Sequence, residues 1–277
     1  MFLWNGELVE EEEIQVSHKD RGYYFGDGIY EVFRIYKGKL FEKQAHLTRM
    51  YQSLHNVKIK VQWDEHALAA KLDELVALFG EHDGYLYVQI TRGEAPRTHT
   101  IPDVITPVML GYCEAYTSPY SQMEHGIAAI TVDDIRWHHC HIKSLNLLPN
   151  TLARQQAKES GADEAIFVRD GIVTEGSSSN LFIVKNGVIR THPANHLILE
   201  GITRQVIERI AKSEGIPFES KAFHVEELMD ADEVMITSST REITPVISID
   251  MKPIGSEKPG PITRQLQAAF NRLVDDN

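Results

Sequence analysis

Lys143 is the residue in this sequence whose setting best suits covalent chemistry. It lies within Asp134–Asn146, a run whose pattern predicts the end of a strand just before a helix. A lysine amine attacks an aldehyde only in its neutral form, which burial in an apolar setting favours. Ile142 and Leu145 beside it predict such a setting. The alternative is an ordinary exposed lysine at a strand end.

Three further segments carry groups that suit an aldehyde cofactor with a ring nitrogen and a phosphate. Glu175 is a carboxylate that would keep the ring nitrogen protonated by ion pairing. Gly201–Thr203 opens a predicted helix, where unpaired N–H groups and the helix dipole favour a phosphate. Ser238 and Ser239 supply more donors after an apolar strand. Together these groups fit a pyridoxal phosphate site, although each one alone also fits a plain turn or helix cap.

Arg97 and His99 are candidates for binding a carboxylate. They lie in a loop that follows a predicted strand. Residues i and i+2 of an extended chain share a face, so the guanidinium and the imidazole can grip one carboxylate together. A solvated loop with no ligand is the alternative.

The run His138–His141 contains imidazole and thiol groups, which suit zinc. Neighbouring residues on a strand point to opposite faces, so only His139 with His141, or His138 with Cys140, would converge. Two ligands need further partners, and we therefore expect no metal site. The role of the three histidines is left open.

Composition excludes several classes of partner and location. The 40 acidic residues against 28 basic ones give a formal charge of −12, which disfavours binding to nucleic acid and to anionic lipid. Cys113 and Cys140 are not spaced as a redox pair or a metal knuckle, so we expect reduced thiols and a cytoplasmic protein. No segment approaches the roughly 20 apolar residues that span a bilayer, and residues 1–6 contain no basic region or apolar stretch that resembles a signal sequence, so we expect neither feature.

Periodicity predicts a mixed α and β fold with antiparallel pairing in both halves. One helix has its apolar face at Leu47, Met50, Tyr51 and Leu54, and Arg49 projects to the opposite side, so the pattern predicts that Arg49 is exposed. The other expected helices are 64–80, 148–160, 203–213 and 262–273, and the expected strands include 29–36, 85–91 and 104–112. Hairpin turns are predicted at Asp170-Gly171 and Asn186-Gly187.

The length of the chain predicts one large domain or two medium domains. Polar residues and a proline interrupt the periodicity at 115–121, which we interpret as a linker between an N-terminal α/β domain, 1–114, and a C-terminal domain, 122–277, that would bind the cofactor.

In this order, the motifs resemble those of the fold-type IV pyridoxal phosphate enzymes, most closely the bacterial D-amino acid aminotransferase branch. The resemblance covers nearly the whole chain, and jointly its motifs are highly specific. It implies a two-domain α+β fold with an antiparallel sheet and helices in the first domain and a pseudo-barrel-like sheet with helices in the second. The matching segments are Asp20–Gly22, Phe25–Gly28, Tyr30–Val32, Ile142–Asn146, Thr174–Asn180 and Gly201–Arg204.

The resemblance also implies a role for each candidate residue. Lys143 would be the Schiff-base lysine and proton shuttle, and Glu175 would pair with the pyridine nitrogen. Arg49 would bind the phosphate, which overrules its exposed interpretation. The other phosphate-binding residues would be Ile202, Thr203, Ser238 and Ser239. Leu199 would pack beside the cofactor, and Glu31 and Ser178 would support the site. Tyr30, Arg97 and His99 would form the substrate carboxylate trap, with Arg97 and His99 contributed by the second subunit of a homodimer.

The same fold hosts L-branched-chain aminotransferases and aminodeoxychorismate lyases, so the fold alone does not choose the reaction. A lysine on one face of the cofactor removes the α-hydrogen only of the enantiomer whose carboxylate lies in the trap, and the presence of Tyr30, Arg97 and His99 favours D-amino acids. The expected reaction is ping-pong transamination through a Lys143 internal aldimine, converting D-alanine and 2-oxoglutarate to pyruvate and D-glutamate. Phe33 and Arg34 leave the side-chain preference open. A non-enzymatic protein, or one that depends on a metal, is the remaining alternative.

Overall fold

The structure is a computed structural model that describes residues 1–277, and the chain divides into two compact units. The first unit contains Met1–Thr117 and the short segment Ile142–Leu147, and the second contains Ser118–His141 and Leu148–Asn277. The segment that carries Lys143 therefore belongs to the first unit, although the chain on both sides of it belongs to the second. The division into domains 1–114 and 122–277 remains a prediction, and it includes the segment Ile142–Leu147 in the C-terminal domain.

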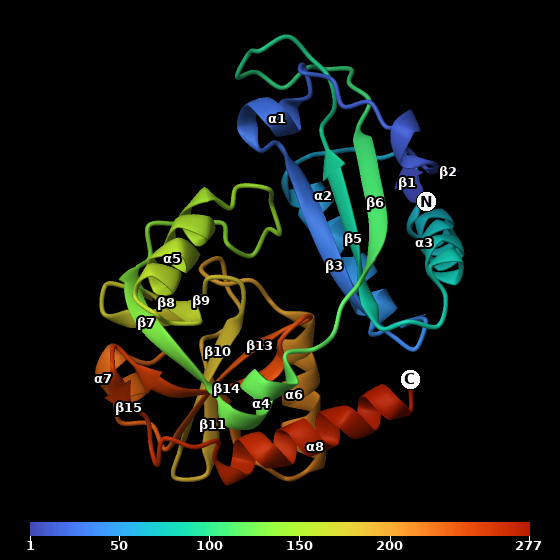
Figure 1. The fold of residues 1–277 in the computed structure, drawn as a ribbon. Helices are drawn as coiled ribbons and strands as arrows, with labels where there is room; N and C mark the ends of the chain where they lie inside the picture. Colours follow the sequence, from blue (N-terminus) through green and yellow to red (C-terminus); the bar gives the residue numbers. More distant parts are fainter. The chain divides into compact units, whose positions relative to one another are not determined.

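The first unit is built on a six-stranded antiparallel sheet with the order β2-β1-β6-β5-β3-β4. Two helices, α2 and α3, cover one face of it and share an apolar core with the strands (Figure 1). The predicted third strand begins at Val108, four residues later than expected. The elements are β1 (Phe2–Trp4), β2 (Glu7–Val9), the 3-10 turn Glu11–Glu13, α1 (Arg21–Phe25), β3 (Gly28–Tyr36), β4 (Lys39–Leu40), α2 (Lys43–Asn56), α3 (Glu65–Phe79), β5 (Gly84–Thr91) and β6 (Val108–Ala115).

Helix α3 forms where the sequence predicts it, for local reasons. The Asp64 side chain accepts a hydrogen bond from the Ala67 amide at 2.7 Å and so satisfies one of the free donors of the first turn. Gly80 ends the helix with a positive φ of 87°. Between these ends the apolar residues recur at helical spacing and are buried in the core: Leu68, Leu72, Leu75 and Val76.

The second unit contains a nine-stranded mixed sheet with the order β12-β11-β10-β13-β14-β7-β8-β9, and β15 pairs with β14. The predicted hairpins β8–β9 and β10–β11 are confirmed, but β7 in the middle pairs in parallel with both of its neighbours. β9 is the last strand in this order, yet a tight turn joins it to β10 near the other end, where the Gly176 amide donates to the Ser179 carbonyl at 2.7 Å. The sheet therefore curls on itself, as expected for a pseudo-barrel. The strands are β7 (Ile127–Asp133), β8 (Glu164–Arg169), β9 (Ile172–Gly176), β10 (Asn180–Lys185), β11 (Val188–Thr191), β12 (Phe218–Ser220), β13 (Glu233–Ser238), β14 (Glu242–Ile249) and β15 (Lys252–Pro253).

The hairpin turns have the backbone that their sequences predict. Asp170 and Gly171 have φ angles of 52° and 78°, and Asn186 and Gly187 have φ angles of 51° and 78°. Two successive residues with positive φ make the turn whose twist matches that of the flanking strands.

Five helices complete the second unit. α6 and α8 lie beside each other against the sheet, and α5 packs on β8 (Figure 1). None of the helices in the chain combines the length and apolar character that crossing a membrane requires. The helices are α4 (Tyr120–His125), α5 (Leu148–Glu159), α6 (Ile202–Ser213), α7 (Val225–Met229) and α8 (Pro261–Asp275).

The prediction that Lys143 ends a strand is wrong. β7 stops at Asp133, and no regular element intervenes before α5 begins at Leu148. The Asp134 carboxylate accepts a hydrogen bond from the Arg136 amide at 3.2 Å, a local side-chain bond that competes with strand pairing. The expectation that a helix follows Lys143 closely is confirmed by α5.

Candidate active site

Lys143 is held against β3 by its backbone. Its carbonyl accepts a hydrogen bond from the Tyr30 amide at 3.0 Å, and its own amide donates to the Ser53 hydroxyl at 3.3 Å. The Nζ atom lies over the face of the Tyr30 ring, 4.2 Å from its centroid. No carboxylate lies at ion-pair distance from this amine. A lysine with a fixed backbone and no acidic partner is suited to react with an aldehyde.

The Glu31 carboxylate lies on β3, fully buried, and binds two basic side chains. Arg49 donates to it from Nε at 3.0 Å and from Nη2 at 2.6 Å, and His46 Nδ1 lies 3.0 Å from Oε1. Burial opposes ionisation of Glu31, but the charges of Arg49 and His46 outweigh it and hold the pKa of the carboxyl well below its ordinary value. Burial lowers the pKa of the His46 imidazole.

The prediction from periodicity that Arg49 is exposed is wrong, because the residue is only 8% exposed. His46, Arg49 and Ser53 recur at i, i+3 and i+7 and form a buried polar stripe beside the apolar stripe of α2. The sequence reasoning missed His46. Its position three residues before Arg49 was the signal that would have placed both side chains on one face of the helix.

Arg97 and His99 lie together in the loop that follows β5. The Arg97 guanidinium lies 5.3 Å from the centroid of the Phe25 ring, and the His99 ring lies 5.6 Å from the same centroid. Arg21 holds the loop through a 2.8 Å hydrogen bond from Nη1 to the Thr98 carbonyl. Both candidate side chains are exposed, so they are accessible to a ligand.

Phe33 and Arg34 are both buried and make contacts that hold the first unit together. Phe33 is fully buried in the core of the first unit and packs on the His46 ring, with 4.8 Å between centroids. Arg34 is 1% exposed and donates to the carbonyls of Gly84, at 2.5 Å, and Tyr116, at 3.1 Å. The first therefore fills the core, and the second ties β3 to the ends of β5 and β6.

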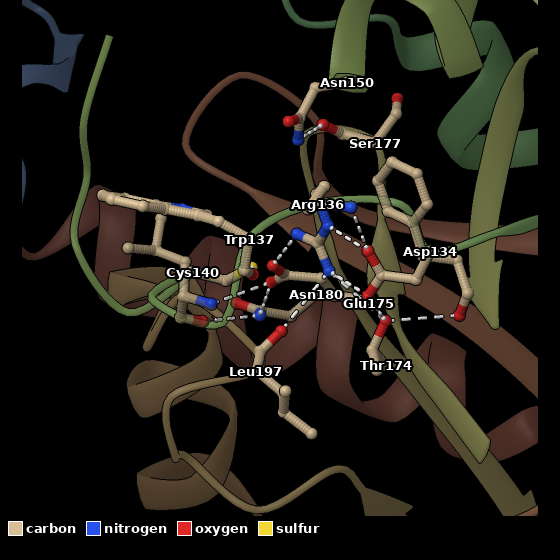
Figure 2. Close-up of polar contacts among 12 residues, drawn as sticks. Asp134, Arg136, Trp137, Cys140, Asn150, Thr174, Glu175, Ser177, Asn180 and Leu197 are labelled. Carbon is tan, nitrogen blue, oxygen red and sulfur yellow. Dashed lines mark hydrogen bonds and ion pairs between the residues drawn. The ribbon is translucent and has the colours of Figure 1, made fainter. Parts of the chain in front are cut away.

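In the second unit, Glu175 lies on β9 and is 5% exposed. Its carboxylate accepts hydrogen bonds from Arg136 Nη1 at 2.5 Å, from Asn180 Nδ2 at 3.1 Å and from the Leu199 amide at 3.0 Å. Figure 2 shows the Arg136 guanidinium between Glu175 and Asp134. Burial raises the pKa of Glu175 to about 7, and Arg136 and the Leu199 amide oppose that rise.

The first turn of α6 offers a site for a phosphate. Its N-cap is Gly201. No side chain caps the amides of this turn, which include those of the buried residues Ile202 and Thr203. Near the end of β13, the Thr237 hydroxyl is buried without a hydrogen-bond partner, Ser238 is the last residue of the strand, and Ser239 begins the turn that follows. An anionic group suits unpaired amides at a helix N-terminus, so the residues present fit a phosphate.

Ser178 is exposed in the turn between β9 and β10. Its neighbours point inward instead: the hydroxyls of Ser177 and Ser179 donate to the fully buried Glu164 carboxylate, the second at 3.0 Å. The predicted supporting role of Ser178 remains a prediction.

The histidine run has an irregular backbone, so the strand argument used to pair its side chains does not apply. The His139 and His141 rings lie 5.7 Å apart, and the Cys140 thiol donates to the Trp137 carbonyl at 3.1 Å. Burial raises the pKa of Cys140 to about 11. No group of three or more acidic, histidine or cysteine side chains is arranged to hold a metal ion.

Each unit therefore gathers part of the predicted site. The first brings Tyr30, Glu31, Arg49 and Lys143 together, and the second brings Glu175 and Leu199 together. Arg136 and Asp134 were missed as site residues, although they lie in the run that contains Lys143. The joining of the two sets into one site remains a prediction.

Comparison with known proteins identifies the family. Residues 28–249 match the family described as amino-transferase class IV. The chain is 47% identical to a D-alanine aminotransferase of Bacillus licheniformis over 272 residues, which cover 98% of this chain and 96% of that protein. It is 46% identical to a D-alanine aminotransferase of Staphylococcus aureus (strain N315) over 278 residues, which cover 100% of this chain and 98% of that protein.

Solved structures show the same fold. The branched-chain amino acid aminotransferase of Escherichia coli superposes with a TM-score of 0.93 at 26% identity, covering 99% of this chain and 94% of that one. The branched-chain amino acid aminotransferase of Thermobaculum terrenum, in its PLP-form (holo-form), superposes with a TM-score of 0.87 at 26% identity, covering 99% and 93%. This chain is a member of the amino-transferase class IV family with the fold-type IV architecture.

Proposed function

We propose that this protein transfers amino groups between D-amino acids and 2-oxo acids, with pyridoxal phosphate as its cofactor. The observation that carries the proposal is the 47% identity to a D-alanine aminotransferase over 98% of the chain. D-alanine and 2-oxoglutarate are the proposed substrates, and pyruvate and D-glutamate the products.

Bound pyridoxal phosphate would supply an aldehyde and an electron-withdrawing ring. We assign Lys143 as the amine that binds the aldehyde and that carries the proton away from the substrate α-carbon. This assignment is supported by the hydrogen bonds that fix its backbone and by the position of its Nζ atom over the Tyr30 ring. Glu175 would hold the ring nitrogen protonated, since its carboxylate is buried and can accept a hydrogen bond from a cationic ring.

The phosphate would bind at the amides of Ile202 and Thr203, at Ser238 and Ser239, and at Arg49. The uncapped N-terminus of α6 supports this assignment. Leu199 would pack beside the ring while its amide orients Glu175, and Glu31 would orient Arg49 from behind.

The substrate carboxylate would bind to Tyr30, Arg97 and His99, with Arg97 and His99 reaching the site of a second subunit in a homodimer. Their common position beside Phe25 and their exposure support a shared role in recognition.

The test is to incubate the purified protein with D-alanine and 2-oxoglutarate and to measure pyruvate. Parallel reactions contain L-leucine or L-alanine in place of D-alanine, or omit the oxo acid. Pyruvate formation that requires both D-alanine and 2-oxoglutarate supports the proposal. Activity confined to L-branched-chain substrates, which the likeness to branched-chain aminotransferases would allow, would falsify its stereochemical part.

Two variants test the residue assignments. Borohydride reduction followed by peptide mass mapping should find the cofactor on the peptide that contains Lys143, and Lys143→Ala protein should carry no such adduct. Arg97→Ala should raise the KM for D-alanine by about tenfold to a hundredfold, since a charge-assisted hydrogen bond contributes roughly 1.5–3 kcal/mol. Arg272→Ala, which removes an exposed arginine of α8, is the matched control and should leave KM unchanged.

A further inference from the structure

A row of alternating charges lies behind Glu175 in the second unit. Arg136 contacts Glu175 at 2.5 Å, Asp134 binds Arg136 at 2.9 Å through both of its oxygens, and Arg169 Nη2 lies 3.0 Å from Asp134. All four side chains are largely buried. Arg136 and Asp134 belong to the irregular segment after β7, and Arg169 ends β8.

The Arg136 guanidinium is fixed on every side. Asp134 binds its Nε and Nη2 atoms as a fork, and Nη2 also donates to the Thr174 hydroxyl and the Leu197 carbonyl, each at 3.3 Å. One face stacks over the Phe167 ring, 4.3 Å from its centroid. These contacts fix the plane of the guanidinium, so its Nη1 atom is directed at the Glu175 carboxylate (Figure 2).

The two oxygens of Glu175 have different partners. Oε1 accepts from Arg136, whereas Oε2 accepts from the neutral donors of Asn180 and Leu199. Arg136 is thus the cationic side chain that binds the carboxylate, and the other two donors fix its second oxygen. A carboxylate held at both oxygens does not rotate freely.

We propose that Arg136, oriented by Asp134, is a positioning residue that fixes the direction of the Glu175 carboxylate and favours its anionic form. This inference rests on the proposed function, in which Glu175 must face the ring nitrogen of the cofactor with a negative charge. Arg136 acts through Glu175 and touches neither substrate nor cofactor. Asp134 acts one step further back, because it holds the guanidinium and offsets part of its charge.

Arg136 and Asp134 have opposite effects on the pKa of Glu175. Burial raises the pKa of Glu175 to about 7, Arg136 lowers it and Asp134 raises it. The other ionisable groups nearby are Arg204, which is cationic, and Cys140, whose pKa burial raises to about 11 so that its thiol stays neutral. Removing the charge of Arg136 should favour protonated Glu175, and removing that of Asp134 should favour the carboxylate.

The decisive experiment measures the Glu175 carboxyl directly in the cofactor-free protein. Infrared difference spectra against Glu175→Gln, recorded as a function of pH, isolate the band of this one group. In Arg136→Gln the titration should move to higher pH by about one to three pH units, the range that a neighbouring opposite charge imposes. In Asp134→Asn it should move to lower pH. Arg190→Gln, which removes an arginine from β11 near the surface of the same unit, should leave it in place.

A role in stability alone would not move the titration in opposite directions for the two variants. Equal titration in wild type, Arg136→Gln and Asp134→Asn would overturn the proposal, as would a shift of both in one direction. Arg136→Lys keeps the charge, so it should titrate close to wild type, and it also serves if Arg136→Gln fails to fold.

Kinetics of the holoenzyme supply a second readout. Arg136→Gln should lower kcat by about tenfold to a hundredfold while KM changes little. This is the size of loss seen in metalloenzymes when a residue that orients a metal ligand is replaced, and Arg136 would orient Glu175 in a similar way. A change confined to KM would contradict a role through Glu175. The infrared titration needs no substrate, so it tests the role of Arg136 independently of catalytic activity. If wild-type protein makes no pyruvate from D-alanine, that result overturns the proposed function, and the titration still tests the role of Arg136.

Discussion

At the scale of single residues, two buried carboxylates of this protein, Glu31 and Glu175, are each paired with buried basic side chains. Glu31 binds Arg49 and His46 in the first unit, and Glu175 binds Arg136 in the second. A buried charge without a partner is costly, so each group persists only as a whole. The same compensation keeps the side chains in one orientation, as a binding site for a rigid ring requires.

Replacement of Glu31 by Gln should destabilise the protein by about 3–5 kcal/mol at neutral pH, because Arg49 and His46 would lose their buried anionic partner. The pKa of Glu31 is lowered in the folded state from an ordinary value of 4.5, so its stabilising effect is complete above that pH and is lost as pH falls below it. The difference between wild type and Glu31→Gln, measured by urea unfolding, should therefore shrink in acid. A difference that stays constant from pH 7 to the acid range contradicts this account, and Glu7→Gln, which changes an exposed residue of β2, is the control.

At the scale of elements, the N-terminus of α6 depends on close packing at Gly201. A Cβ atom there would fall 2.1 Å from Asn180 Oδ1, although the backbone φ of −64° is acceptable for any residue. Asn180 also donates to Glu175 and to the Leu199 carbonyl, so this glycine lets the helix N-terminus approach the network around Glu175. Gly187 is a glycine for a different reason: its surroundings are open, but its φ of 78° disfavours a side chain.

These two glycines predict a separation of effects. Gly201→Ala should displace Asn180, cost about 1–3 kcal/mol of stability through overpacking and weaken pyridoxal phosphate binding. Gly187→Ala should cost about 1–2 kcal/mol through backbone strain and leave the affinity unchanged. Urea unfolding and titration of cofactor into the apoprotein measure both quantities. Equal affinity in the two variants would argue against a phosphate site at α6.

At the scale of the whole molecule, the chain passes between the two units three times, after Thr117, His141 and Leu147. The segment Ile142–Leu147 returns to β3, where the Leu145 amide donates to the Gly28 carbonyl at 3.0 Å and Ser144 forms a β-bridge with Ile29. The first unit is therefore not completed by its N-terminal residues alone.

A protein cut between Thr117 and Ser118 should stay together, because the fragment that begins at Ser118 still supplies Ile142–Leu147 to β3. A protease site inserted there, followed by size-exclusion chromatography with and without urea, tests this expectation. Fragments that separate in native buffer would contradict it. Intact protein carrying the same insertion, without protease, controls for damage by the insertion itself.

Much of the fold was predictable because its signals are local. The caps of α3, the hairpin turns at Asp170-Gly171 and Asn186-Gly187, and the start of α6 after Gly201 each depend on a few adjacent residues. A backbone conformation that one short stretch prefers by itself can be read from that stretch. The roles assigned to Lys143 and Glu175 came from resemblance to a family and remain predictions.

Only the tertiary structure decided which polar side chains are buried together. Arg49 faces away from the centre of its helix's apolar stripe, yet Glu31, 18 residues earlier, draws it inside with His46. Arg136 and Glu175 meet across 39 positions, and Lys143 joins the first unit through backbone bonds to β3. Burial and charge pairing are properties of residues that are distant along the chain and neighbours in space, so no local pattern contains them.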